Sequence, residues 1–124
     1  MIDHVSVAVR DLATAMRFYE AVLATIGITK LETRPTTAGF GKQYPEFWIN
    51  LRESGVQTSD GAHVCFRART PEIVDAFHAT ALAAGGTDDG APGLRPHYGG
   101  GYYAAFVRDL DGNRVEAVTF VSAC

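Results

Sequence analysis

The stretch that determines the expected fold reads IDHVSVAVRDL and spans residues 2–12. Its valines alternate with smaller or polar residues, His4 among them, and a period of two is typical of a β-strand with one buried face. We therefore expect a strand from Ile2 to Val9. Asp11 can accept a hydrogen bond from a free backbone N–H of a first helical turn, so it is expected to cap a helix.

The expected helix carries one apolar stripe and ends at a glycine. Apolar residues recur at spacings of three and four, the pattern of an amphipathic helix that packs one face on a sheet. The stripe consists of Leu12, Met16, Tyr19, Leu23 and Ile26. Gly27 is expected just after the helix, where a positive φ costs glycine little.

The same pattern starts again 59 residues later. The stretch HVCFRA (residues 63–68) alternates like the first strand, and Thr70-Pro71 is typical of a helix start. At this offset, without gaps, seven pairs are identical between residues 4–27 and 63–86: His4/His63, Val5/Val64, Arg10/Arg69, Phe18/Phe77, Leu23/Leu82, Ala24/Ala83 and Gly27/Gly86. The alternative is that any two βα units look alike, but strand propensity does not require a histidine at both strand starts.

The remainder of each half is expected to add strands. The first half has its best strand candidate at residues 46–51 (EFWINL), followed by a polar loop over 53–61. In the second half, the stripe Ile73, Phe77, Ala81 and Leu82 predicts a helix that ends at Gly85-Gly86. A loop over 87–101, a strand over 102–107, a hairpin turn over 109–113 and a return strand over 114–121 follow.

These elements predict an α+β fold built from two βαβββ modules. One helix and a few strands cannot close a core alone, so the two copies are expected to associate. We predict a single domain over residues 1–124, with modules at about 1–60 and 61–124. The modules should form a curled, mostly antiparallel sheet with the helices on its outer face.

Composition and charge exclude several classes of protein. Of 124 residues, 47% are hydrophobic and 20% charged, which is a globular mix and not a disordered or fibrous one. A net charge of −3 supplies no basic surface for nucleic acid. No apolar run approaches the about 18–20 residues of a membrane span, and no signal peptide is expected. Cys65 and Cys124 are too few for a disulfide scaffold, which favours a reducing cytoplasm.

Strand alternation places two histidines on the face away from the helices. His4 and His63 have the opposite parity to the valines that pack on the helical layer, so both are expected on the concave side of the sheet. Parity leaves the side of Glu116 open, because both faces of its strand are largely apolar. An ionised carboxylate in a dry helix-packed layer is costly, so the concave side is expected for Glu116 too. Two imidazoles and one carboxylate form a facial triad suited to a divalent metal such as Zn, Ni, Mn or Fe.

Paired βαβββ units that open with a His-Val strand resemble the vicinal-oxygen-chelate superfamily, which includes glyoxalase I, fosfomycin- and bleomycin-resistance proteins and extradiol dioxygenases. The resemblance rests on residues 2–12, on Phe18-Tyr19 with Gly27, and on residues 106–116 with their Asp-x-Asp-Gly-Asn turn. It implies that His4, His63 and Glu116 occupy metal-ligand positions. It also implies a homodimer, which the exposed sheet edges of a short chain favour as well.

The sequence departs from the superfamily pattern at one position. Fuller sites of the superfamily take a fourth ligand from the last strand of the first half, where this chain has Trp48 or Ile49. Neither side chain can ligate a metal, so a site with three ligands, or none, is expected.

Other residues are candidates for substrate contact. Residues 95–103 combine a glycine triplet with His97, Tyr98, Tyr102 and Tyr103, which suits a mobile lid over a pocket. Tyr98, Tyr102 and Tyr103, together with Trp48, are candidates to line a pocket for a planar ligand, although core packing explains aromatic residues nearly as well. Arg67 shares the face of His63 and is a candidate partner for a substrate carboxylate, and His97 is a candidate general acid or base.

Two functions of different classes follow. The first is a metal-dependent lyase, isomerase or dioxygenase that binds adjacent oxygens of a small substrate, with glyoxalase (lactoylglutathione lyase) as the default reaction. The second is a metal-free protein that sequesters a drug or metabolite, as bleomycin-resistance proteins do. The missing fourth ligand favours the second, and the retained triad favours the first.

Overall fold

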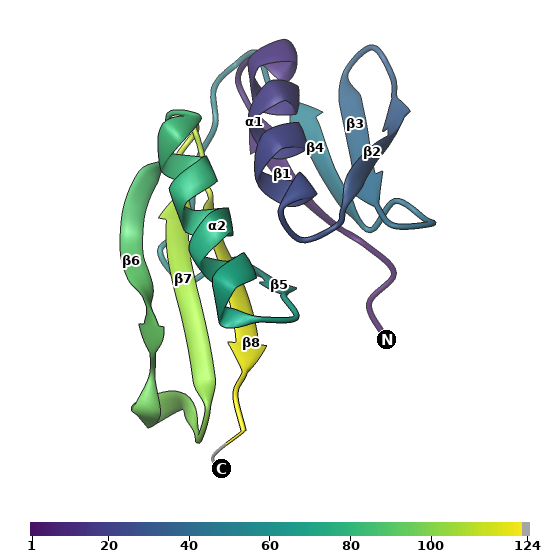
Figure 1. Ribbon diagram of the computed structural model, residues 1–124. Coiled ribbons are helices and arrows are strands. Elements are labelled where there is room, and N and C mark those ends of the chain that lie inside the picture. The colour runs from purple at the N-terminus through teal and green to yellow at the C-terminus, as the bar shows by residue number, and fades with distance from the viewer. Residues whose placement is uncertain (123–124) are drawn as a thin grey trace.

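The computed structural model describes residues 1–122 and contains two successive βαβββ modules (Figure 1). The first module comprises β1 (Val5–Val9), α1 (Leu12–Ala24), β2 (Thr29–Thr33), β3 (Thr37–Gly41) and β4 (Phe47–Leu51). The second comprises β5 (Val64–Arg67), α2 (Pro71–Ala83), β6 (Thr87–Leu94), a 3-10 helix (Pro96–Tyr98), β7 (Tyr102–Arg108) and β8 (Arg114–Phe120). Cys124, one of the two cysteines in the sequence, lies outside the described residues.

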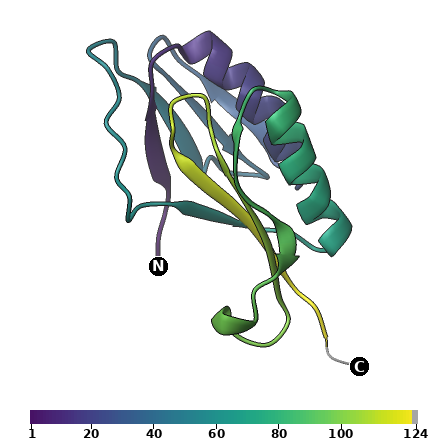
Figure 2. The same cartoon turned by 90° about the vertical axis from the view of Figure 1, so that its left-hand side faces the viewer.

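Each module folds its strands into a sheet of its own. The strand orders are β1-β4-β3-β2 and β5-β8-β7-β6, so the same topology occurs twice. The first strand of each module pairs in parallel with the last, and the other pairs are antiparallel. In Figure 2, α1 and α2 lie along the same side of the molecule with the strands on the other side. The predicted α+β class and the two βαβββ modules are confirmed.

Local sequence signals set the helix ends as predicted. The side chain of Asp11 accepts a hydrogen bond from the backbone N–H of Thr14 at 2.9 Å, and that of Thr70 accepts one from Ile73 at 3.2 Å. Pro71 occupies the first turn of α2, where a missing N–H leaves no helical bond unmade. Gly27 follows α1 with φ of +80°.

Replacing Asp11 with alanine should lower stability in a pH-dependent way. The hydrogen bond from Thr14 lowers the pKa of Asp11 below its ordinary value of 3.8. The ionised cap therefore stabilises the fold above that value, and the contribution is lost as pH falls through the lower folded-state pKa. At neutral pH, Asp11→Ala should unfold at a lower urea concentration than the wild type. The difference between the two midpoints should become smaller at pH about 3. Asp11→Asn, which keeps the acceptor, should lose much less; an equal loss for both variants at every pH would refute this role.

The prediction of a loop over residues 87–101 was wrong. Residues 87–94 form β6, which pairs with β7, and a 3-10 turn follows. The register shifts between Asp88 and Gly90 and again between Gly90 and Gly93, so the strand is irregular. Backbone hydrogen bonds to β7 hold it, and its small and polar side chains do not alternate in hydropathy. That pairing with a later strand explains why local pattern did not reveal the strand.

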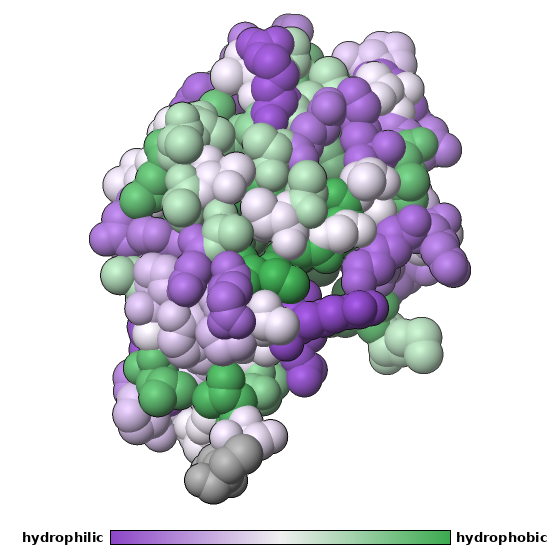
Figure 3. Space-filling view, in the orientation of Figure 1, coloured by the Kyte–Doolittle hydropathy of each residue, from purple (hydrophilic) through white to green (hydrophobic). Residues whose placement is uncertain are grey.

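One core joins the two modules. Phe47 of the first module packs edge-on against Phe66 of the second, with ring centroids 5.2 Å apart, and these rings continue to Tyr19 and Phe77. In Figure 3, hydrophobic side chains form the floor of a hollow between the modules and hydrophilic ones its rim. A cleft of about 430 Å³ between β4 and β5 has this character, lined by Val5, Ile28, Phe40, Phe47, Val64 and Phe66, with Lys42, Glu46 and Arg67 as charged neighbours.

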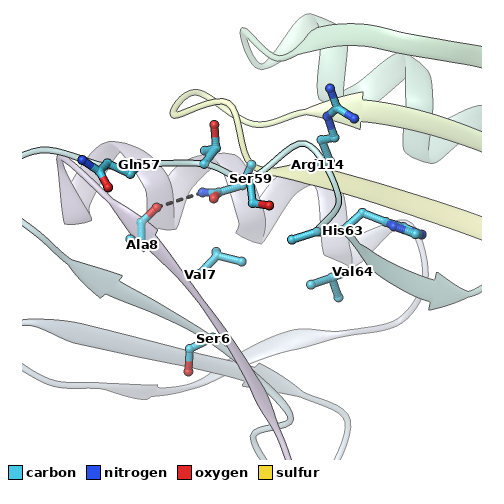
Figure 4. Close-up of a pocket in the computed structure, with 11 residues that line it drawn as sticks. Ser6, Val7, Ala8, Gln57, Ser59, His63, Val64 and Arg114 are labelled. Atoms are coloured by element: carbon cyan, nitrogen blue, oxygen red, sulfur yellow. Dashed lines mark hydrogen bonds between the residues drawn. The ribbon is translucent and has the colours of Figure 1, made fainter.

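The turn between β7 and β8 fastens the modules together. One carboxylate oxygen of Asp109 accepts hydrogen bonds from the backbone N–H groups of Asp111 and Asn113, and the other accepts the hydroxyl of Tyr19 in α1 at 2.6 Å. The amide of Asn113 donates to the carbonyl of Ala8 in β1 at 2.8 Å, the dashed line in Figure 4. Burial raises the pKa of Asp109 and that of Tyr19. The Asp-x-Asp-Gly-Asn motif therefore has a structural task between the modules.

Candidate functional site

A carboxylate and an imidazole meet on the open face of the second sheet. Val115 and Ala117 of β8 lie in the core, so Glu116 between them points to the face opposite the helices. Glu116 is 1% exposed, and its Oε1 lies 3.0 Å from Nε2 of His63, which immediately precedes β5. The hydroxyl of Tyr102 in β7 donates to the other carboxylate oxygen. Three separate elements thus position the polar groups around one buried carboxylate.

These residues line a cavity of about 310 Å³, which we name the second-module cup. Its walls are His63, Tyr98, Tyr102, Phe106 and Glu116. The side chain of His63 is 49% exposed, so its ring stands at the mouth while Glu116 forms the floor. Tyr98 packs edge-on against Tyr102 with centroids 5.2 Å apart, which builds one aromatic wall. The cup combines apolar rings with a few convergent polar groups, as small-molecule sites commonly do.

Desolvation and the Glu116 charge keep the neighbouring acids protonated. They raise the pKa of the Cys65 thiol to about 12, because a thiolate beside a buried carboxylate is disfavoured. Desolvation and the hydrogen bond to Glu116 also raise the pKa of Tyr102. Both groups are therefore neutral near pH 7. Cys65 is thus unsuited to act as a thiolate nucleophile.

The first sheet carries a second cavity, of about 390 Å³, which we name the first-module cup. It is lined by His4, Ser6, Arg34, Thr37, Tyr44, Trp48 and Asn50. Nδ1 of His4 lies 2.6 Å from a carboxylate oxygen of Asp3, and the hydroxyl of Tyr44 donates to the same carboxylate. The side chain of His4 is 52% exposed. His4 therefore belongs to a different cup from His63 and Glu116 within one chain.

Strand register identifies which residue of the first module corresponds to Glu116. Ser6 pairs with Trp48, and Cys65 pairs with Glu116. Since Ser6 and Cys65 are equivalent at the repeat offset of 59, Trp48 occupies the position equivalent to Glu116. The sequence alone left Trp48 and Ile49 as alternatives. Ile49 instead lies fully buried in the core.

The other candidate residues divide between the two faces. Tyr98 and Tyr102 line the second-module cup. Arg67 stands over the ring of Phe120 at 4.6 Å from its centroid, and His97 is exposed beside Tyr98 at 4.1 Å between centroids. Tyr103 points the other way, because its hydroxyl donates to Asp75 of α2. The structure therefore separates Tyr103 from the cup and places His97 next to Tyr98, outside the residues that line the cup.

A divalent metal would find two donors in the second-module cup. His63 and Glu116 are a donor pair that Zn, Fe and Mn accept, and their closest atoms lie 3.0 Å apart. Among residues 1–122, however, no three His, Cys, Asp or Glu side chains converge on one point. The donor chemistry of these two residues fits a divalent metal, and any third protein ligand would come from outside the second-module cup.

Several residues in or beside the first-module cup were not predicted from the sequence as site residues. Asn50 has the parity of Trp48 and was detectable from alternation along β4. Arg34 and Tyr44 lie outside the strands, in the connections after β2 and before β4, where no periodic pattern exists. Asp3 was visible only as a neighbour of His4.

Comparison with known proteins agrees with this architecture. The family model described as the glyoxalase/bleomycin resistance protein/dioxygenase superfamily matches residues 1–117. The chain belongs to this superfamily. Its similarity to a virulence protein of Salmonella typhimurium extends over 97% of this chain and 84% of that protein, at 30% identity.

Solved structures of the superfamily share the fold. A glyoxalase/bleomycin resistance protein from Albidiferax ferrireducens superposes with a TM-score of 0.84 at 34% identity, over 94% of this chain and 95% of that one. The fosfomycin resistance protein FosX of Listeria monocytogenes gives a TM-score of 0.74 at 17% identity, over 98% and 93% of the two chains, which is a likeness of fold. In the part of the chain that is described, neither helix has the length and apolar character needed to span a bilayer.

Proposed function

We propose that this superfamily member is a metal-dependent lyase, isomerase or dioxygenase that acts on a small substrate with two adjacent oxygen atoms. The observation that carries the proposal is the contact between His63 and the buried Glu116 at the floor of the second-module cup. A buried carboxylate is costly without a strong partner, and a bound cation together with an imidazole would satisfy it. A bound divalent metal would supply Lewis-acid polarisation of the substrate oxygens.

The third ligand in this proposal is His4 of a second copy of the chain. His4 and His63 immediately precede β1 and β5, which are edge strands of their sheets, and both imidazoles are about half exposed. A twofold homodimer that brings the first-module cup of one copy to the second-module cup of the other would complete two equivalent sites. Figure 4 supports this arrangement, because the ring of His63 extends away from β1 of its own chain.

Within the site, the chain's own residues would orient the Glu116 carboxylate and exclude water from the substrate. Tyr102 donates to Glu116 and so holds the carboxylate in one orientation, which leaves Glu116 able to accept a proton from a substrate carbon or oxygen. Phe106 and Tyr98 line the walls and exclude water. Arg67, at the edge of the same sheet face, is a proposed contact for substrate charge. His97, exposed beside Tyr98, is the proposed group for proton exchange with solvent.

Metal content tests the proposal. Wild-type protein purified without chelators should contain about one tightly held divalent metal per chain, and His63→Ala should lose it. His78→Gln is the matched control, because His78 pairs with Asp88 on the surface of the second module. Retention of metal by His63→Ala, or no metal in the wild type after supplementation with Zn, Ni, Mn and Fe, would contradict the proposal.

Mixing two inactive variants tests the shared site. His4→Ala and His63→Ala homodimers should each lack an intact triad. Co-refolded mixed dimers should recover one site, because the intact His63 of one chain meets the intact His4 of the other. No recovery in verified mixed dimers would mean that His4 is not contributed across the interface. Oxygen consumption by the active protein then separates a dioxygenase from a glyoxalase-type lyase or isomerase.

A metal-free binding protein is the second candidate. Two observations favour it: both carboxylate oxygens of Glu116 already have a partner within the chain, and Trp48 occupies the equivalent position in the first module. In that case the aromatic walls would hold a drug or metabolite, in the reducing cytoplasm that the sparse cysteines favour. A metal-free protein that binds aromatic ligands at its cups would support this function.

A further inference from the structure

The lining of the first-module cup combines polar side chains with one cation. Its seven lining residues include Arg34 and no carboxylate. The guanidinium carbon of Arg34 stands 5.0 Å from the centre of the Trp48 ring, a cation–π contact that restrains the position of the guanidinium. The second-module cup has the carboxylate of Glu116 at the position equivalent to Trp48, so the two cups differ in charge.

The guanidinium of Arg34 is only partly paired with other groups of the described chain. Its Nε lies 3.6 Å from Glu32, an exposed and loose contact, and its side chain is 57% exposed. The two terminal nitrogens are the part of the guanidinium that pairs with planar oxyanions in a forked geometry. The nearby carboxylate of Asp3 is engaged by His4 and Tyr44 at the rim.

The part of the cup formed by Thr37 and Asn50 is polar and held in place. The hydroxyl of Thr37 lies 2.6 Å from the side-chain oxygen of Asn50 and 2.9 Å from the carbonyl of Ile49, so the amide of Asn50 has a fixed position. Ring surfaces of Trp48 and Tyr44 complete the lining. Such a cup suits a small planar anion with an organic body.

We propose that the first-module cup binds the carboxylate of a small organic acid, with the Arg34 fork as its anchor and Trp48 as the platform that holds Arg34. This inference deepens the proposed function and rests on it in one respect: the cup adjoins His4, so the substrate with adjacent oxygens would be an organic acid. Binding of the carboxylate itself requires neither the metal nor the second-module cup.

The single tryptophan of the chain makes the test specific. In metal-stripped protein, the indole N–H resonance of Trp48 should shift on titration with benzoate and should shift far less with benzamide, its neutral isostere. Arg34→Gln should weaken benzoate binding about tenfold or more, in line with loss of a charge-assisted bond. Arg17→Gln, on the helix side of the same module, should bind as the wild type does.

Two further arms distinguish the outcomes. Inorganic phosphate should bind more weakly than benzoate; equal or tighter binding would overturn the assignment to a carboxylate. His63→Ala should keep benzoate binding, so that failure of the metal proposal leaves this one standing. Equal affinities for benzoate and benzamide, or unchanged affinity in Arg34→Gln with a native-like spectrum, would overturn it.

Discussion

Glu116→Gln should reduce divalent-metal affinity by more than about 100-fold. Loss of groups that merely orient metal ligands typically costs about 10–100-fold, and loss of a charged ligand should cost at least as much. The substitution keeps the shape of the side chain and an oxygen that can accept the hydroxyl of Tyr102. It removes the negative charge that the proposed metal requires, and any activity that depends on the metal should fall with it.

Metal affinity in the Glu116→Gln experiment is measured by competition with a chelator of known strength, with urea unfolding as a check on the fold. Glu20→Gln is the matched control, because Glu20 lies on α1 and pairs with Lys30 at 2.8 Å. Tyr102→Phe should produce a smaller loss, since it removes only the bond that orients the carboxylate. Wild-type affinity in a folded Glu116→Gln protein would remove Glu116 from the ligand set.

Asp109→Ala should lower the free energy of unfolding by about 3 kcal/mol. The buried hydroxyl of Tyr19 would lose its acceptor, and the backbone N–H groups of Asp111 and Asn113 would lose theirs. Unsatisfied buried polar groups cost about 1–3 kcal/mol each, although water can reach part of this turn. Against a typical total of about 5–15 kcal/mol, this is a large fraction of the stability of a single domain.

Urea unfolding checks the Asp109 prediction, with an expected shift of the midpoint of about 1–2 M for a typical dependence on denaturant. Asp60→Ala is the control, because the side chain of Asp60 is fully exposed and its carboxylate makes a long contact of 3.5 Å with Arg114. Tyr19→Phe should cost less than Asp109→Ala, because the turn bonds survive. A midpoint shift in Asp109→Ala no larger than in Asp60→Ala would show that the turn does not fasten the modules.

The two cups also suggest how the repeats have diverged. The strand framework is the same in both, down to the register that aligns Trp48 with Glu116. The chemistry differs, with a cation over an indole in one cup and a carboxylate with an imidazole in the other. In the proposed dimer each complete site would combine one cup of each kind.

Local sequence patterns predicted much of the fold. The valine alternation in β1, the caps Asp11 and Thr70 and the repeat offset of 59 are short-range features, and each appears in the structure where it was expected. Strand β6 was missed because its partner β7 holds it through backbone hydrogen bonds, which side-chain periodicity does not record.

For the site, alternation alone predicted the open face of the sheets for His4 and His63, since a strand turns successive side chains to opposite faces. Only the folded chain reveals that His63 and Glu116 meet while His4 lies in another cup, because distances between separate sheets depend on how the modules pack. The pairing of Arg34 with Trp48 likewise arises from the course of the connection after β2, which no periodicity encodes.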